Sequence, residues 1–128
     1  MSTILIVEDN PANMQLSTFL LESAGHTAVA ATTAEAGVAL AAECRPDLIL
    51  MDIQLPGMDG LQATALLKAN EATRDIPVIA LTALAMKGDE ERIRAAGCDG
   101  YIAKPLDYKD FLAVIKATLA RRAEGAAT

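Results

Sequence analysis

The stretch "LILMDIQLPGMDG", residues 48–60, is the part of the sequence from which the fold is best inferred. Four apolar residues run without a break into Asp52, and the chain then turns through Pro56 and Gly57. A short apolar run bounded by turn residues is typical of a strand that is buried on both faces. We therefore predict a strand over residues 47–51 that presents Asp52 at its carboxyl end.

Similar strand patterns alternate with helical patterns along the rest of the chain. The predicted strands cover residues 3–7, 26–31, 47–51, 76–82 and 100–103, and the predicted helices cover residues 10–25, 32–44, 59–70, 87–97 and 107–122. Strands that are apolar throughout need helices on both faces of a parallel sheet. The sequence therefore predicts an α/β fold, a doubly wound five-stranded parallel sheet with five helices, in which strands 47–51 and 76–82 are central.

Local signals mark several helix ends. Pro11 suits the first turn of a helix, and Gly25 is a typical residue just beyond a helix end. Thr32 and Glu35 have the spacing of a capping box. An apolar stripe on helix 107–122 is predicted to face the core and consists of Tyr108, Phe111, Leu112, Ile115 and Leu119.

The composition excludes several classes of protein. The 128 residues fit one domain, and their net charge of -6 argues against binding to nucleic acid, which needs a basic face. No apolar stretch approaches the ~20 residues of a membrane span, and the start does not resemble a signal peptide. We therefore expect a cytoplasmic protein. Its two cysteines, Cys44 and Cys98, are predicted to be small buried thiols, and His26 is the only histidine.

Polar residues follow four of the predicted strands. They are Glu8 and Asp9 after the first strand, Asp52 after the third, Thr82 at the end of the fourth, and Lys104 with Pro105 after the fifth. The carboxyl ends of parallel strands lie at one edge of the sheet, where ligands bind in such folds. Three crowded carboxylates repel one another, and a hard cation with oxygen ligands relieves that repulsion. Glu8, Asp9 and Asp52 therefore predict a Mg²⁺ site.

A carboxylate, a hydroxyl, a lysine and Mg²⁺ at one edge fit phosphoryl transfer. A carboxylate such as that of Asp52 can act as a nucleophile and form an aspartyl phosphate. Mg²⁺ and the Lys104 ammonium would neutralise charge on the transferring oxygens, and the Thr82 hydroxyl would bind one of them. The apolar run before Asp52 would then serve to hold the nucleophile on a rigid central strand.

The segments "ILIVEDN", "LILMDIQLPGMDG", "IALTA" and "GYIAKP" together resemble the motif set of the response-regulator receiver family of two-component signalling. The resemblance covers residues 3 to about 122, with residues 1–123 expected to form the receiver domain and 124–128 a short flexible tail. It implies the CheY-like strand order 2-1-3-4-5. The segment "TALAMKGDEERIRAAGCDGYIAKP" further resembles single-domain, DivK-like regulators and the receivers of hybrid kinases.

The resemblance also implies residue roles. Asp52 would be the phosphoacceptor, Asp9 a direct Mg²⁺ ligand, Glu8 a ligand largely through water, and the main-chain carbonyl of Gln54 the third protein ligand. Thr82 and Lys104 would contact the phosphoryl group. The Lys104–Pro105 bond would be cis, since tight turns can hold that costly isomer. One departure from the commonest pattern is Glu8, where many receivers carry Asp.

Family behaviour further implies a switch and its partners. Tyr101 would move inward when Thr82 moves, and the output surface would be helix 87–97, strand 100–103 and helix 107–122. Gln54 and Leu84 would tune the lifetime of the acyl phosphate. The phosphodonor would be a sensor histidine kinase or a histidine phosphotransfer protein that docks near Asn13 and Met14, which are expected to be exposed. The downstream target would be a protein, and the chain a monomer or a weak, phosphorylation-dependent dimer.

Three alternatives compete with this interpretation. A phosphatase of the haloacid-dehalogenase type needs D-x-D after its first strand, whereas this strand ends in Glu8-Asp9. A nucleotide-binding module needs a glycine-rich phosphate loop, and the sequence contains no G-x-x-x-x-G-K-[ST]. A receiver fold that binds its partners without phosphorylation remains open.

Overall fold

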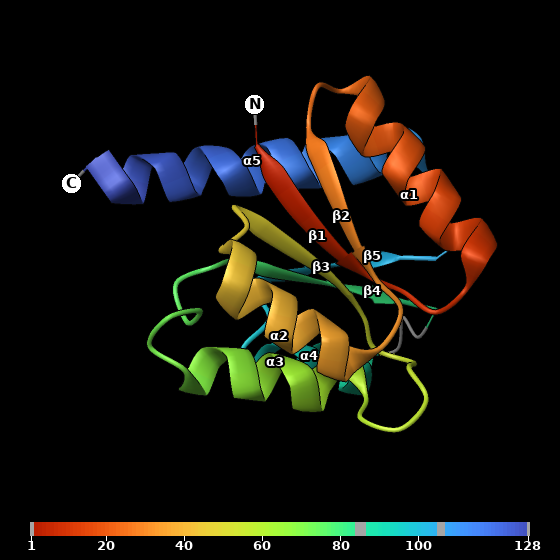
Figure 1. Cartoon of the computed structure of the whole chain (residues 1–128), viewed down its shortest axis with the longest axis vertical. Coiled ribbons are helices and arrows are strands. Elements are labelled where there is room, and N and C mark those ends of the chain that lie inside the picture. The colour runs from red at the N-terminus through yellow and green to blue at the C-terminus, as the bar shows by residue number, and fades with distance from the viewer. Residues whose placement is uncertain (1, 84–86, 105–106, 128) are drawn as a thin grey trace.

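The computed structural model describes residues 2–83, 87–104 and 107–127 of the chain (Figure 1). Strands and helices alternate along it. The elements are β1 (Thr3–Val7), α1 (Pro11–Ser23), β2 (Thr27–Ala31), α2 (Ala34–Cys44), β3 (Leu48–Asp52), α3 (Gly60–Ala69), β4 (Val78–Thr82), α4 (Lys87–Ala95), β5 (Gly100–Ala103) and α5 (Tyr108–Ala127). Among the helices of this part of the chain, none has both the length and the apolar character that a membrane span requires.

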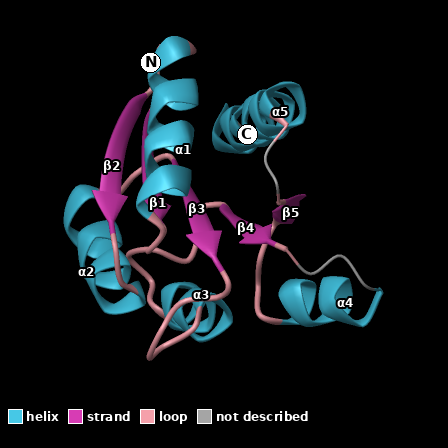
Figure 2. Ribbon diagram, turned by 90° about the vertical axis from the view of Figure 1, so that its right-hand side faces the viewer, coloured by secondary structure: helices cyan, strands magenta, loops and turns pink. Residues whose placement is uncertain are grey.

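The strands form one parallel sheet in the order β2-β1-β3-β4-β5 (Figure 2). Every residue of β3 and of β4 is buried, as the unbroken apolar runs predict for interior strands. The edge strand β2 is less buried, with Thr27 and Ala30 exposed and Ala28 and Val29 half-buried. The predicted fold class, strand order and central strands are therefore confirmed.

Two apolar cores cover the two faces of the sheet. On one face, Leu5 and Ile49 pack with buried residues of α2, α3 and α4. On the other face, Ile4 and Leu50 pack with buried residues of α1 and α5. Figure 1 shows the same division, with α1 and α5 on one side of the sheet and α2, α3 and α4 on the other. Side chains alternate along each strand, so every interior strand contributes to both cores.

The predicted start of α2 was wrong. Its N-cap is Thr33, whose hydroxyl accepts a hydrogen bond from the Ala36 N–H at 3.1 Å, and α2 begins at Ala34. With Thr33 as the cap, Glu35 lies one position too early for a capping box with it. Its carboxylate still lies in the first helical turn, where the helix dipole favours negative charge. A capping box is present at α3, where Asp59 and Gln62 form it.

Four further predictions from composition and helical pattern need correction or remain open. Tyr108 is 56% exposed, because the apolar stripe of α5 reaches the core through Phe111 and Ile115 and only begins beyond the first turn. Cys44 is exposed at the end of α2, whereas Cys98 is buried, and both thiols are free. α5 continues to Ala127, past the predicted helix end at residue 122. The flexibility predicted for residues 124–128 stays a prediction.

Candidate functional site

Asp52 is the last residue of β3 and lies almost completely buried at the carboxyl edge of the sheet. Its Oδ1 accepts a hydrogen bond from the Gln54 N–H at 2.9 Å. Its Oδ2 accepts one from Lys104 Nζ at 3.1 Å. Both carboxylate oxygens therefore have fixed partners, and the rigid strand holds the group at the edge of the sheet.

Glu8 and Asp9 follow β1, the strand that pairs with β3. Glu8 is buried, and its Oε1 accepts a hydrogen bond from the same Lys104 Nζ at 3.1 Å. Asp9 is exposed. One carboxylate oxygen from each of Glu8, Asp9 and Asp52 lies within 4.8 Å of the others. The structure therefore brings the three predicted carboxylates together.

This crowding changes the proton affinities of the buried groups. The pKa of Glu8 is raised to about 7, mainly by burial and also by the adjacent Asp52 carboxylate, whose effect exceeds the opposing effect of Lys104. Burial alone would lower the pKa of Lys104, but the hydrogen bonds and the charge attraction of Asp52 and Glu8 together outweigh that effect and raise the pKa. Lys104 is thus a firmly protonated cation between two carboxylates.

The donor set fits a hard divalent cation. Glu8 Oε2 is buried and has no hydrogen-bond partner among the described residues, so it has an unused lone pair beside the Asp52 carboxylate. A single lysine compensates only part of the charge of three carboxylates. Mg²⁺ takes carboxylate oxygens and water as ligands, and one exposed carboxylate such as Asp9 leaves room for water.

Thr82 ends β4 beside the carboxylates. It is buried, and its carbonyl oxygen accepts a hydrogen bond from the Lys104 N–H at 2.8 Å. In the sheet register Tyr101 lies opposite Ala80, two residues before Thr82, so Tyr101 and Thr82 belong to the same face of the sheet. Tyr101 is half-buried and packs against the core on the α3 and α4 side.

Two predicted site residues lie outside the described part of the chain, and two others differ from their predicted exposure. Leu84 and Pro105 lie outside the described residues, so the lifetime role of Leu84 and the cis Lys104–Pro105 bond stay predictions. The expectation that Asn13 and Met14 are exposed was wrong. Both are half-buried, because this side of α1 turns toward the sheet and Met14 packs against the core.

Two features near the site were missed by the sequence reasoning. Leu16 and Phe19 are the exposed large apolar residues of α1, at 42% and 60% exposure. Gly60 is buried at the start of α3 against the main chain of Asp52. The exposure of Leu16 and Phe19 could have been predicted from the sequence. Both lie one turn apart on the side of the helix away from Leu21. The contact of Gly60 depends on tertiary packing, which no local pattern encodes.

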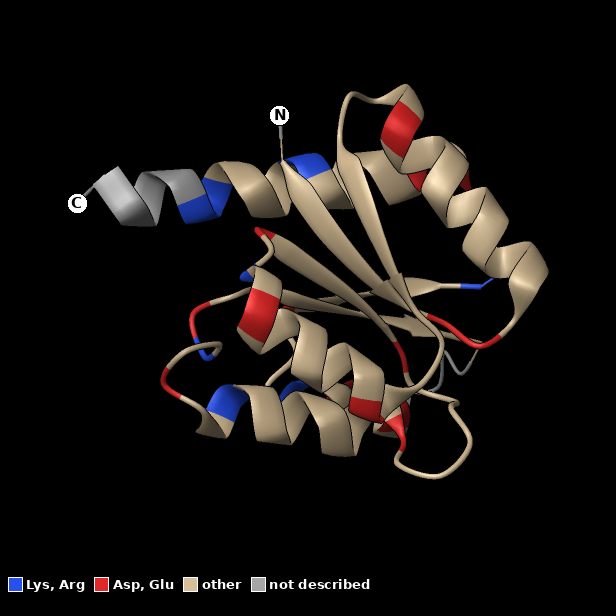
Figure 3. Cartoon of the chain, viewed as in Figure 1, with Lys and Arg blue, Asp and Glu red and all other residues tan. Residues whose placement is uncertain are grey.

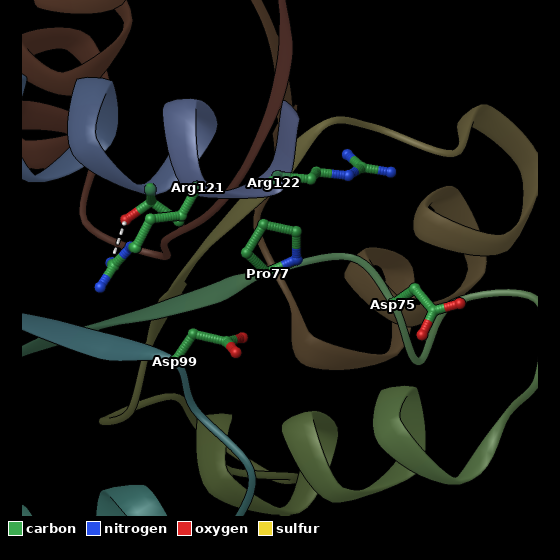
Figure 4. Close-up of a pocket in the computed structure, with 6 residues that line it drawn as sticks. Asp75, Pro77, Asp99, Arg121 and Arg122 are labelled. Atoms are coloured by element: carbon green, nitrogen blue, oxygen red, sulfur yellow. Dashed lines mark hydrogen bonds between the residues drawn. The ribbon is translucent and has the colours of Figure 1, made fainter. Parts of the chain in front are cut away.

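A separate cavity of about 350 Å³ lies at the opposite edge of the sheet (Figure 4). Asp75 and Pro77 precede β4, Asp99 precedes β5, and Arg121 and Arg122 come from α5. Several of these charged side chains are engaged within the fold. Asp99 pairs with Lys68 at 3.1 Å, and Arg122 donates to the Asp47 carbonyl at 2.6 Å. This cavity is therefore distinct from the carboxylate site.

Comparison with known proteins agrees with the geometry of the site. The chain is 50% identical over 117 residues to the polar-differentiation response regulator DivK of Brucella anthropi. Its identity to DivK of Brucella ovis is the same, and each alignment covers 91% of this chain and 95% of the relative. The receiver domain of the sensor histidine kinase PA1611 from Pseudomonas aeruginosa is 37% identical, with a TM-score of 0.87 and coverage of 93% of this chain and 98% of that one. That structure contains a magnesium ion coordinated in its active-site cleft.

A further structural neighbour is the CheY-like response regulator receiver domain protein from Methanospirillum hungatei. It is 31% identical, with a TM-score of 0.88, and the similarity covers 98% of both chains. The response regulator receiver domain itself matches residues 4–116. With its acidic cluster, its sheet order and this match over most of its length, the chain belongs to the response regulator receiver family and resembles DivK, and phosphorelay signalling is the function of that family.

Proposed function

We propose that Asp52 accepts a phosphoryl group from a phosphohistidine donor, with Mg²⁺ bound by Asp9, by Asp52, by the Gln54 carbonyl and, largely through water, by Glu8. The observation that carries the proposal is the hydrogen bonding of one Lys104 ammonium to both Glu8 and Asp52 beside the Asp9 carboxylate. The chain is a signalling phosphoacceptor that promotes only its own phosphorylation and slow dephosphorylation.

The reaction is a displacement at phosphorus. One Asp52 carboxylate oxygen forms the new bond to phosphorus, the bond from phosphorus to the histidine nitrogen breaks, and the imidazole leaves with the electron pair. Lys104 holds its proton throughout, since its pKa is raised, and its charge stabilises the transferring oxygens. When bound, Mg²⁺ supplies further charge neutralisation at these oxygens.

Phosphorylation then operates a switch at Thr82 and Tyr101. The new group adds about -1.5 to -2 charges and strong acceptor oxygens. The Thr82 hydroxyl moves to bind one of these oxygens, and Tyr101, on the same face of the neighbouring strand, fills the space that Thr82 leaves. The output surface of α4, β5 and α5 changes as a result, and a downstream protein target reads the change.

The donor docks on α1, through a surface formed by Leu16 and Phe19. Neighbouring exposed apolar side chains can form a protein interaction site, and these two lie one helical turn apart. No Lys or Arg precedes Arg45 in the sequence, and this acidic first third of the chain suits a donor with cationic residues around an apolar contact (Figure 3). The donor would be a sensor histidine kinase or a histidine phosphotransfer protein.

The remaining parts of the proposal concern the molecule as a whole. Residues 1–123 form the receiver domain and residues 124–128 a short flexible tail. The protein acts in the cytoplasm as a monomer or a weak, phosphorylation-dependent dimer. Gln54 and Leu84 set the lifetime of the acyl phosphate.

Intact-mass analysis after incubation with acetyl phosphate and Mg²⁺ tests the central proposal. We expect a single phosphoryl adduct that requires Mg²⁺ and is absent from the Asp52→Asn variant. No adduct with acetyl phosphate or a phosphoramidate would reject the Asp52 mechanism and favour a receiver fold that binds its partners without phosphorylation.

A further inference from the structure

The first turn of α3 packs directly against the main chain of the phosphoacceptor. A Cβ atom at Gly60 would lie 2.2 Å from the carbonyl oxygen of Asp52 and 2.7 Å from the Cα of Ile53. The glycines with positive φ are Gly25, Gly57 and Gly97, so the backbone conformation of Gly60 does not itself require glycine. The reason for glycine at this position is space, because only a hydrogen fits between α3 and the end of β3.

Hydrogen bonds hold Gly60 in this place. The Gly60 N–H donates to the Ile53 carbonyl at 3.4 Å, which closes the loop formed by residues 53–59. The buried Thr64 hydroxyl donates to the Gly60 carbonyl at 2.7 Å, and the thiol of Cys98 lies 3.8 Å from the same hydroxyl. The capping box of Asp59 fixes the start of the helix. Both ends of the loop are therefore tied to the main chain next to Asp52.

We infer that Gly60 and Thr64 are positioning residues of the phosphoacceptor site. They fix the main chain of Asp52 and the loop that contains Gln54, and so set where the carboxylate and the Gln54 carbonyl lie. The inference rests on the proposed function. A misplacement of about 1 Å in a reacting group can reduce a rate by about 100-fold, and a methyl group at Gly60 forces either α3 or β3 to move.

The chain provides matched controls for both residues. Gly37 is also crowded, since a Cβ there would lie 2.6 Å from Val7 Cγ2, but its neighbour is a side chain of the core, whereas the neighbours of Gly60 are main-chain atoms of the site. Thr118 is, like Thr64, a buried helical threonine, and its hydroxyl donates to the Val114 carbonyl at 2.8 Å. Gly37→Ala therefore adds a crowding methyl group, and Thr118→Val removes a buried hydroxyl hydrogen bond, each away from the site.

The test compares Gly60→Ala with Gly37→Ala, and Thr64→Val with Thr118→Val. For each variant, the rate of phosphorylation by acetyl phosphate, the dissociation constant for Mg²⁺ and the urea midpoint of unfolding are measured. We expect Gly60→Ala to be phosphorylated about tenfold more slowly or worse, and to bind Mg²⁺ more weakly. Thr64→Val should show the same changes to a smaller degree. The two controls should lose stability while keeping rates and affinities within about twofold of the wild type.

Each outcome decides a separate question. A wild-type rate and Mg²⁺ affinity in folded Gly60→Ala would overturn the inference, as would equal losses in the controls. If Gly60→Ala does not fold, Thr64→Val against Thr118→Val gives the answer. If the wild type itself is not phosphorylated, the proposed function fails, whereas the Mg²⁺ affinities still test the positioning.

Discussion

At the scale of single residues, Ser17 has an unfavourable environment. It is fully buried in α1, and its hydroxyl oxygen has no hydrogen-bond partner among the described residues. A buried, unpaired hydroxyl costs about 1–3 kcal/mol, and alanine is also the better helix former. We expect Ser17→Ala to raise the free energy of unfolding in urea denaturation by more than Ser23→Ala does. Ser23 lies in the same helix and its hydroxyl donates to the Phe19 carbonyl at 2.7 Å, so an equal gain in both variants would contradict this account.

Single residues at the site were predictable where the backbone pattern alone places them. Glu8 and Lys104 follow strands of one parallel sheet and Asp52 ends another, so their meeting at one edge follows from the fold class. The exposure of an individual side chain was less predictable. Tyr108 lies outside the core although it shares a helical face with Phe111, because exposure depends on where α5 meets the sheet.

At the scale of elements, the cap of α2 can be tested directly. Thr32 and Thr33 are adjacent, and only the Thr33 hydroxyl accepts a hydrogen bond from the helix, at the Ala36 N–H. Loss of an N-cap of this kind costs about 1 kcal/mol. We expect Thr33→Ala to lower the free energy of unfolding by about that amount in urea denaturation and Thr32→Ala to change it much less. A larger loss of stability in Thr32→Ala than in Thr33→Ala would contradict this account and favour a capping box of Thr32 and Glu35.

The elements themselves were predictable because their patterns are strong. Both β1 and β5 have the predicted bounds, because turn residues on either side of a short apolar run restrict where the strand can begin and end. Helix ends were less certain. Two neighbouring threonines offer equal capping chemistry, and the geometry of the preceding turn selects between them. The end of α5 was placed too early, since small residues such as those after Arg122 are compatible with both helix and coil.

At the scale of the whole molecule, stability is unevenly distributed in a way that suits a switch. The interior strands β3 and β4 are buried throughout, and they carry Asp52 and Thr82 at their ends. In contrast, Ile93 is the only buried side chain among the described residues of α4. The ion pairs of this helix, Asp89–Arg92 and Glu90–Arg94, lie within α4 and do not attach it to the sheet. Chemistry thus takes place on the rigid part of the fold, next to a helix with few attachments.

Hydrogen exchange measured by mass spectrometry tests whether α4 responds to phosphorylation. Burial of one isoleucine contributes about 1.5–3 kcal/mol, which is small beside the burial of whole strands, so α4 should open more readily than β3 and β4. We expect faster exchange in α4 than in those strands, and a change in that rate when acetyl phosphate and Mg²⁺ are added. The Asp52→Asn variant, treated in the same way, should show no change. Exchange in α4 as slow as in β3, and unaffected by phosphorylation, would mean that α4 is a fixed part of the fold and that the signal leaves the molecule elsewhere.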